Sequence, residues 1–328
     1  MLPETRSEEK VFIKHSNGHS KVKSSLFNPG SLLFAGIASL LYLLVSYSLL
    51  GFKVDQFILV GIFNFCYFTS RITRNFITGF SIFIIYWIIF DYMKVFPNYL
   101  FNEVHIESLY QLEKSLFGIE MNGAVLTPNE YFALHPARFM DVLAGVFYLC
   151  WIPIPLSFAA FLFFRKRTAF FQFALNFFLV NCIGFIGYYL YPAAPPWYVA
   201  KYGFTFNAAT PGNTGALNRF DNYFGISVFE NMYAKSSNVF AAMPSMHAAF
   251  MLLVLFYGIK YRLKYWNILF AIILVGIWFS AVYTSHHYIL DVIAGILSGF
   301  IAIGLIQWWM ANKSGRKAMQ FMVSISSK

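Results

Sequence analysis

The sequence predicts an all-α integral membrane protein with about eight transmembrane helices. Of its 328 residues, 59% are hydrophobic and 21% aromatic, and only 12% are charged, whereas about 25% of the residues in a soluble domain are charged. Apolar segments of about 20 residues, the length that spans a bilayer, recur along the chain. Lysine and arginine gather in the short segments between them. Because charges are costly in hydrocarbon, this distribution indicates a lipid-facing surface.

Eight segments have the composition of membrane spans. They are residues 31–50, 54–70, 76–96, 139–164, 168–191, 244–261, 265–283 and 288–310. The second is short and carries Gln56 and Asn64, but omitting it would place basic clusters on alternate sides of the membrane. With eight spans and an internal N-terminus, most of the 24 lysines and arginines are cytoplasmic, as the positive-inside rule requires. Both termini are therefore expected in the cytoplasm.

The spans divide the chain into regions. These are a cytoplasmic basic tail (1–30), N-terminal transmembrane helices (31–96), a catalytic membrane core with two long outer segments (97–311) and a second cytoplasmic tail (312–328). No signal peptide precedes the first apolar run, which should remain as a span. The outer segments, 97–138 and 192–243, are longer than simple connections usually are. Within the first, residues 104–117 are amphipathic and are expected to lie on the membrane surface as a helix.

Composition argues against several partners. The net charge of +10 could suggest nucleic acid, but no basic stripe interleaved with aromatics lies on a polar face. Cys66, Cys150 and Cys182 fall inside apolar runs without a partner at metal-ligand spacing. We therefore expect these cysteines to act as small apolar side chains that fill space between helices. The expected partners are membrane lipids, with no nucleic acid, no partner protein and no cofactor.

Three polar segments lie at the outer ends of predicted spans. They are residues 191–198 (YPAAPPWY), 243–247 (MPSMH) and 284–291 (TSHHYILD). His287 and Asp291 are four residues apart, so we expect them on one helix face. The carboxylate can then accept the Nδ1 proton of the imidazole and leave Nε2 basic. The alternative is a polar pair that only helps helices to associate.

The second of these segments predicts an anion site. Pro244 suits the first turn of a helix, and the amides of Ser245, Met246 and His247 would then be free donors at the positive helix end. His287 would attack phosphorus through Nε2, and His247 would protonate the leaving oxygen and later deprotonate the acceptor. The alternatives are a satisfied interfacial histidine, or one metal ion held by His247, His286, His287 and Asp291. No Gly-x-Ser-x-Gly sequence surrounds Ser245, which argues against a serine hydrolase.

At these residues the chain resembles the type 2 phosphatidic acid phosphatase superfamily. The superfamily signatures Pro-Ser-x-His and His-x-x-x-Asp match residues 244–247 and 287–291. Within it, the chain is similar to the inositol phosphorylceramide synthase branch, on the residues 116–118 (LFG), 191–198, 238–247 (NVFAAMPSMH) and 285–288 (SHHY). The similarity covers roughly residues 104–309. It implies a six-helix catalytic core, with His287 as nucleophile and His247 as acid and base.

The sequence also departs from the superfamily pattern. No Lys-x6-Arg-Pro signature is present, and Ser280-Ala281 stands where Ser-Arg is usual. Cationic side chains clamp a phosphomonoester, whose charge is about −1.5 to −2, whereas a diester carries a single charge. The absence of both cationic signatures therefore favours headgroup transfer over monoester hydrolysis. Other side chains can compensate by folding back onto the phosphate; the candidates are His286, Arg219, Lys201, Arg138 and Lys235.

The resemblance implies a membrane phosphotransferase that moves a phospho-headgroup, phosphoinositol in that branch, from a glycerophospholipid to a ceramide-like alcohol. The alternative with the same three residues is a lipid phosphate or polyprenyl pyrophosphate phosphatase, and a transporter is a third interpretation. The substrate is expected to contact a lipid-side wall at the membrane interface, formed by Pro195, Pro196, Trp197 and Tyr198, although the same aromatics are also typical of interface anchors. The active site should face the periplasm or a lumen, and the short tails favour a bacterial inner membrane.

Overall fold

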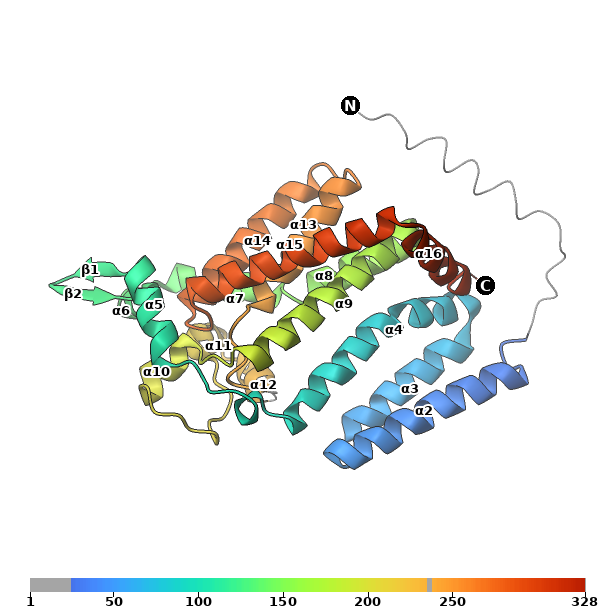
Figure 1. Cartoon of the computed structure of the whole chain (residues 1–328), viewed down its shortest axis with the longest axis horizontal. Coiled ribbons are helices and arrows are strands. Elements are labelled where there is room, and N and C mark those ends of the chain that lie inside the picture. Colours follow the sequence, from blue (N-terminus) through green and yellow to red (C-terminus); the bar gives the residue numbers. More distant parts are fainter. Residues whose placement is uncertain (1–24, 235–237, 328) are drawn as a thin grey trace.

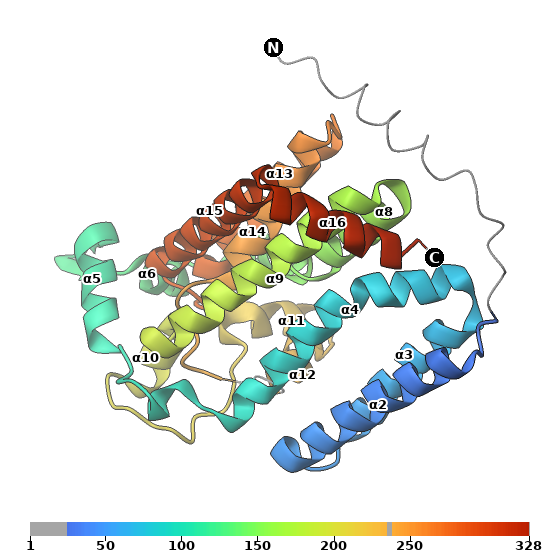
Figure 2. The same ribbon diagram turned by 45° about the vertical axis from the view of Figure 1, so that its right-hand side comes forward.

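The structure is a computed structural model that describes residues 25–234 and 238–327. Most of the expected basic tail, and also Lys235, lie outside the described residues. The described chain is an elongated bundle of helices with a cap of short elements at one end (Figures 1 and 2).

Three N-terminal helices form one side of the molecule, shown in blue and cyan in Figure 1. They are α2 (Pro29–Leu50), α3 (Val54–Thr69) and α4 (Arg71–Tyr92). The Asn28 side chain caps α2 by accepting a hydrogen bond from the amide of Ser31, and Ser70 caps α4 through the amide of Thr73, as is usual at helix N-termini. Of the three, α4 makes the main contact with the rest of the described bundle, along α9.

The remaining long helices form the core. They are α7 (Arg138–Leu149), α8 (Pro153–Arg165), α9 (Arg167–Leu190), α13 (Met246–Lys260), α14 (Trp266–Tyr283) and α15 (Ile289–Ala311). Their shared interior is rich in aromatic side chains, and Phe163, Phe170, Phe173, Phe250 and Tyr257 are fully buried.

The chain is a multi-pass membrane protein. Within the described residues, six helical stretches are long and apolar enough to cross a membrane: Pro29–Leu50, Arg71–Val95, Arg138–Arg165, Arg167–Leu190, Trp266–Tyr283 and Ile289–Ala311. They match six of the eight expected spans. The other two, α3 and α13, are apolar helices of 16 and 15 residues, and their crossing of the membrane stays a prediction.

The expected span 139–164 is not one helix. Helix α7 ends at Leu149 and α8 begins at Pro153. Pro153 lacks the amide that would continue the hydrogen-bond pattern of α7. The break falls at the depth of the histidines and brings Tyr148 and Trp151 beside His247.

The outer segments fold into short elements that cover one end of the bundle (Figure 1). The first contains η1 (Met93–Val95), η2 (Asn98–Leu100), α5 (Glu107–Phe117), β1 (Ile119–Met121), β2 (Ala124–Leu126) and α6 (Pro128–Leu134). The second contains α10 (Pro196–Tyr202), η3 (Gly215–Leu217), α11 (Asn218–Phe224) and α12 (Val228–Ala234).

Two of these elements differ from expectation. The antiparallel pair of β1 and β2 is an exception to the all-α prediction, and its turn places Asn122 and Gly123 at positive φ, as two-residue hairpins require. Helix α5 forms as expected, but it does not simply lie on the membrane. Leu109 and Glu113 on one face are buried against the protein, whereas its Leu112 and Leu116 are exposed.

The segment expected as a C-terminal tail forms α16 (Lys313–Ile325). This helix packs against α9 and α15. Its Met319 is buried, and the Arg167 side chain at the start of α9 donates to the carbonyl of Ser326. The C-terminus is therefore held against the bundle at the end away from the outer segments (Figure 1).

Candidate active site

Two histidines and one aspartate meet where α13 and α15 begin. The Nδ1 atom of His247 lies 3.0 Å from the Nε2 atom of His287. The other ring nitrogen of His287, Nδ1, lies 3.5 Å from Oδ2 of Asp291. His287 and Asp291 are buried, and His247 is partly exposed. The three side chains expected to act together are thus in contact.

His287 is not on the helix face predicted for it. Helix α15 begins at Ile289, and His287 lies in the preceding turn. The amides of His286 and His287 both donate to the carbonyl of Ala281, at 3.1 and 3.0 Å, which fixes the turn. Asp291 lies in the first helical turn, and its carboxylate also accepts the amide of Tyr288 at 2.9 Å. The pairing therefore depends on this turn and not on helical periodicity.

The predicted anion site at 244–247 is also different in detail. Helix α13 begins at Met246, so Pro244 precedes the helix. The Ser245 amide donates to the carbonyl of Asp291 at 2.9 Å and is not free to bind an anion. The two chain segments approach closely because Gly295 has no side chain: a Cβ there would collide with the carbonyl of Ser245. Of the three amides predicted to bind the anion, those of Met246 and His247 remain at the open helix end.

Two tyrosines that the sequence reasoning missed extend this cluster. The hydroxyl of Tyr148 lies 3.1 Å from Nε2 of His247, and the hydroxyl of Tyr233 donates to that of Tyr148 at 2.9 Å. The Trp151 ring packs on His247 with centroids 4.3 Å apart. No motif signals these residues, although Pro153 signals the helix break that positions Tyr148 and Trp151.

A single direction of donation along these contacts gives each hydrogen bond one donor and one acceptor. Tyr233 donates to Tyr148, and Tyr148 donates to Nε2 of His247. His247 then carries its proton on Nδ1 and donates to Nε2 of His287. The remaining proton of His287, on Nδ1, faces Asp291. This polarity makes Nε2 of His287 an acceptor, which is the state of a nucleophile.

The first outer segment braces the turn that carries His287. The Asn129 side chain donates to the carbonyls of Val282 and His287, at 2.8 and 3.0 Å. The carboxylate of Glu113 accepts the amides of Ile289 and Leu290, at 2.9 and 3.1 Å. Glu113 is fully buried, and burial raises its pKa to about 7 despite these two amides. A carboxylate suits the positive end of α15.

His286 faces away from the other two histidines. Its Nε2 lies 2.8 Å from the carbonyl of Thr214, and its ring stacks on Tyr233 with centroids 4.4 Å apart. Burial, with the neighbouring His287, lowers the pKa of His286 to about 3. The ring is therefore neutral and its Nε2 proton is committed to a carbonyl. Its expected contact with phosphate stays a prediction.

The expected cationic residues have other partners. Nε of Arg219 lies 2.7 Å from Oδ1 of Asp141, and its guanidinium lies over the Tyr283 ring. Lys201 is exposed on α10. Arg138 lies over the Tyr223 ring. The structure pairs none of these three with His247 or His287, and phosphate binding by Arg219 and Lys201 stays a prediction.

The segment from Pro195 to Tyr198, expected as a lipid-side wall, is buried in the protein. The amide of Trp197 donates to the carbonyl of Ser285 at 3.0 Å, which attaches α10 to the histidine turn. The hydroxyl of Tyr198 donates to the carbonyl of Thr205. These residues, including Pro196, therefore support the turn from outside, and their contact with substrate stays a prediction.

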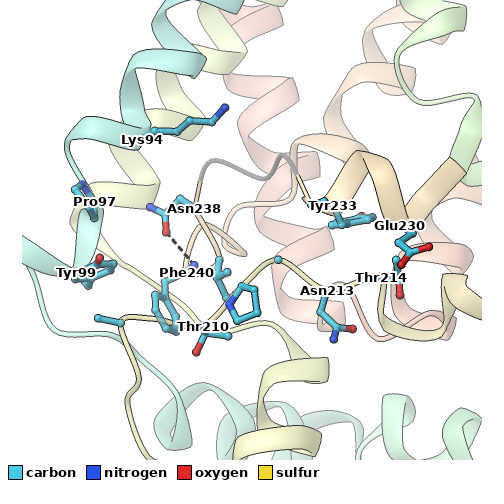
Figure 3. Close-up of a pocket in the computed structure, with 15 residues that line it drawn as sticks. Lys94, Pro97, Tyr99, Thr210, Asn213, Thr214, Glu230, Tyr233, Asn238 and Phe240 are labelled. Atoms are coloured by element: carbon cyan, nitrogen blue, oxygen red, sulfur yellow. Dashed lines mark hydrogen bonds between the residues drawn. The ribbon is translucent and has the colours of Figure 1, made fainter. Parts of the chain in front are cut away.

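A cavity of about 650 Å³ adjoins the cluster on the side of Tyr233 (Figure 3). It is lined by Lys94 of η1, by Pro97 and by Tyr99 of η2, and also by residues of the loop 208–214, of α12 and of the segment 238–240. Within residues 25–234 and 238–327, no group of three or more His, Cys, Asp and Glu side chains is arranged to hold a metal ion.

Comparisons with known proteins point to one family. A model of the PAP2 superfamily matches residues 107–305. The phosphoinositol dihydroceramide synthase of Bacteroides thetaiotaomicron is 45% identical over 78% of this chain and 85% of that protein. The inositol phosphorylceramide synthase of Candida albicans is 29% identical over 59% of this chain and 40% of its own. The corresponding catalytic subunit of Saccharomyces cerevisiae is 34% identical over 37% of this chain and 30% of its own. No solved structure matches the chain.

Proposed function

Because this chain belongs to the PAP2 superfamily, as its motifs predicted, we propose that it transfers phosphoinositol from a glycerophospholipid to a ceramide-like alcohol. The choice of substrates is supported by the 45% identity, over most of both chains, to a phosphoinositol dihydroceramide synthase. The observation that carries the reaction type is the 3.0 Å contact between the facing nitrogens of His247 and His287.

In the first half-reaction, Nε2 of His287 attacks the phosphorus of the donor. The phosphorus–oxygen bond to diacylglycerol breaks, and His247, as an imidazolium that is protonated on both ring nitrogens when the donor is bound, gives its Nδ1 proton to the leaving oxygen. Phosphoinositol is then covalently bound to His287. Asp291 stabilises the positive charge that forms on this ring, as the carboxylate of a hydrolytic triad does for its histidine.

In the second half-reaction, the hydroxyl of the ceramide-like acceptor takes the place of the departed diacylglycerol. His247 removes its proton, the acceptor oxygen attacks phosphorus, and the bond to His287 breaks. The ring nitrogens return to their starting protonation states, so the cycle balances without another reactant. Burial of the cluster restricts water, which would otherwise compete as acceptor.

A phosphodiester donor is supported by the sparse positive charge around the histidines. Both cationic signatures of the superfamily phosphatases are missing from the sequence, and Arg219 is paired with Asp141. A donor with one negative charge needs less compensation than a monoester.

We also propose the finer topology: eight spans with N- and C-termini inside, and the site on the periplasmic side of a bacterial inner membrane. In this arrangement 31–96 are N-terminal transmembrane helices and 97–311 the catalytic core. Support comes from Figure 1, where the start of α2 and α16 lie at the end of the bundle opposite the outer segments. A bacterial relative supports the compartment.

The test is a transfer assay with purified protein in mixed micelles. Phosphatidylinositol with a labelled headgroup and a ceramide are supplied together, and phosphatidic acid is supplied in a parallel reaction. The expected product is ceramide carrying the label, absent from His287→Ala. Release of phosphate from phosphatidic acid, with no labelled ceramide, would refute the transferase function and support the alternative phosphatase function.

A further inference from the structure

Tyr233 and Tyr148 lie between the cavity of Figure 3 and His247 of the candidate active site. Tyr233 forms part of its wall, and its hydroxyl leads through Tyr148 to His247. Thr214 forms another part, and its carbonyl contacts His286. Figure 3 shows Tyr233 and Thr214 on the same side of the cavity, across from Lys94 and Tyr99. The cavity is therefore adjacent to the side chains that contact His247 and His286.

The charged side chains that line this cavity already have partners. Lys94 is bound to Asp91 at 2.7 Å, and Glu230 accepts a hydrogen bond from Ser227 at 2.8 Å. One paired cation and one carboxylate do not make a second phosphate site, since phosphate sites gather cationic side chains and free amides. The cavity is suited instead to an uncharged polar group.

Two asparagines that line the cavity have side-chain amide donors without a partner in the described chain. Oδ1 of Asn213 accepts the amide of Gly215 at 2.8 Å, and Oδ1 of Asn238 accepts the amide of Phe240 at 3.0 Å (Figure 3). Nδ2 of Asn238 is buried without a hydrogen-bond partner in the described chain, a costly state for a donor. The amide nitrogen of Asn213 likewise makes no hydrogen bond to the described residues. A ligand rich in hydroxyl oxygens would satisfy both.

We propose that this cavity binds the polyhydroxyl headgroup of the donor lipid, with Asn213 and Asn238 donating to its hydroxyls. The inference rests on the proposed phosphoinositol transfer. The cavity volume of about 650 Å³ is in the range of small-molecule sites. Hydroxyl groups both donate and accept, which matches a lining of amides and hydroxyls better than a cationic headgroup would.

Replacing each asparagine with serine removes its free amide donor and retains the backbone conformation of its loop. Both asparagines accept the amide two residues ahead, and a serine hydroxyl can make the same turn contact. The double variant Asn213→Ser/Asn238→Ser therefore removes two amide donors with little change in backbone. Asn207→Ser is the matched control, because Asn207 accepts the amide of Ala209 in the same way and lies outside the cavity lining.

The experiment measures transfer to ceramide with the donor and acceptor concentrations varied separately. The double variant should raise KM for phosphatidylinositol and lower kcat/KM roughly 5- to 30-fold, since each hydrogen bond contributes about 1 kcal/mol. KM for ceramide and the thermal midpoint should match those of Asn207→Ser. Phosphatidylglycerol and phosphatidylcholine should be poorer donors for the unaltered protein.

Different results separate this proposal from the proposed function. If the unaltered protein transfers phosphoinositol and the double variant behaves as Asn207→Ser does, the headgroup lies elsewhere and only the cavity proposal is lost. A fall in kcat with an unchanged donor KM overturns it as well. A preference for phosphatidylcholine, or no phosphoinositol transfer by the unaltered protein, would contradict both the cavity proposal and the proposed function.

Discussion

Nδ1 of His247 lies 3.0 Å from Nε2 of His287, and each ring has another polar neighbour at its remaining nitrogen. Tyr148 is at Nε2 of His247, and Asp291 is at Nδ1 of His287. The two rings are thus oriented from opposite sides, and their facing nitrogens, here in contact with each other, are the atoms proposed to act on the bound phosphoryl group. The predictions below test each part of this arrangement.

Replacing either histidine should abolish transfer. His287→Ala removes the nucleophile and His247→Ala the proton donor, so each should lower kcat by at least about 10³-fold. Quenched reactions with labelled donor should show label on the protein for the unaltered enzyme and none for His287→Ala. Label that persists on His287→Ala would mean that another residue is the nucleophile.

Asp291→Asn tests whether the carboxylate orients His287. An amide keeps the size of the side chain and an oxygen for the amide of Tyr288, so folding should be retained. We expect kcat to fall by about 10³- to 10⁴-fold, by analogy with the triad carboxylate. The measurement is steady-state transfer alongside the thermal midpoint. A near-normal rate would show that the 3.5 Å contact with His287 has no catalytic role.

Much of the membrane architecture could be predicted because hydropathy is a local property of the chain. The histidines could be assigned to one depth because topology places both at outer ends of spans. The rest depends on backbone geometry or distant contacts. That α15 begins only at Ile289 follows from the turn at Ala281, and Tyr148 meets His247 across 99 residues with no motif to signal it.

Tyr148→Phe tests the hydrogen bond that orients His247. The ring would still pack in the buried space of α7, but Nε2 of His247 would lose its donor. We expect kcat to fall roughly 5- to 10-fold, the effect of losing about one neutral hydrogen bond, with donor KM unchanged. Tyr257→Phe is the control, because it removes another buried hydroxyl, bonded to the carbonyl of Gln172, away from the histidines. Equal losses of kcat in both variants would indicate a general packing effect.

Glu113→Gln tests the buried carboxylate at the start of α15. Burial raises the pKa of Glu113 from 4.5 to about 7, so between these values the folded protein holds a proton that the unfolded chain has released. Stability from this group is therefore fully present below about pH 4.5 and is lost as pH rises through 7. Nearby Asp291 contributes to the rise in the same direction.

Glutamine does not titrate, so the variant should not show this loss of folding stability as pH rises. The difference in thermal midpoint, Glu113→Gln minus unaltered protein, should become more positive from pH 5 to pH 8, measured in one detergent at constant ionic strength. Comparing the two proteins at each pH cancels the titration of every other group. Glu130→Gln is the matched control, since Glu130 is a partly exposed carboxylate of the same segment that bonds Tyr110 and Thr127. A difference that is constant with pH would mean that Glu113 is ionised throughout this range, held so by the amides of Ile289 and Leu290.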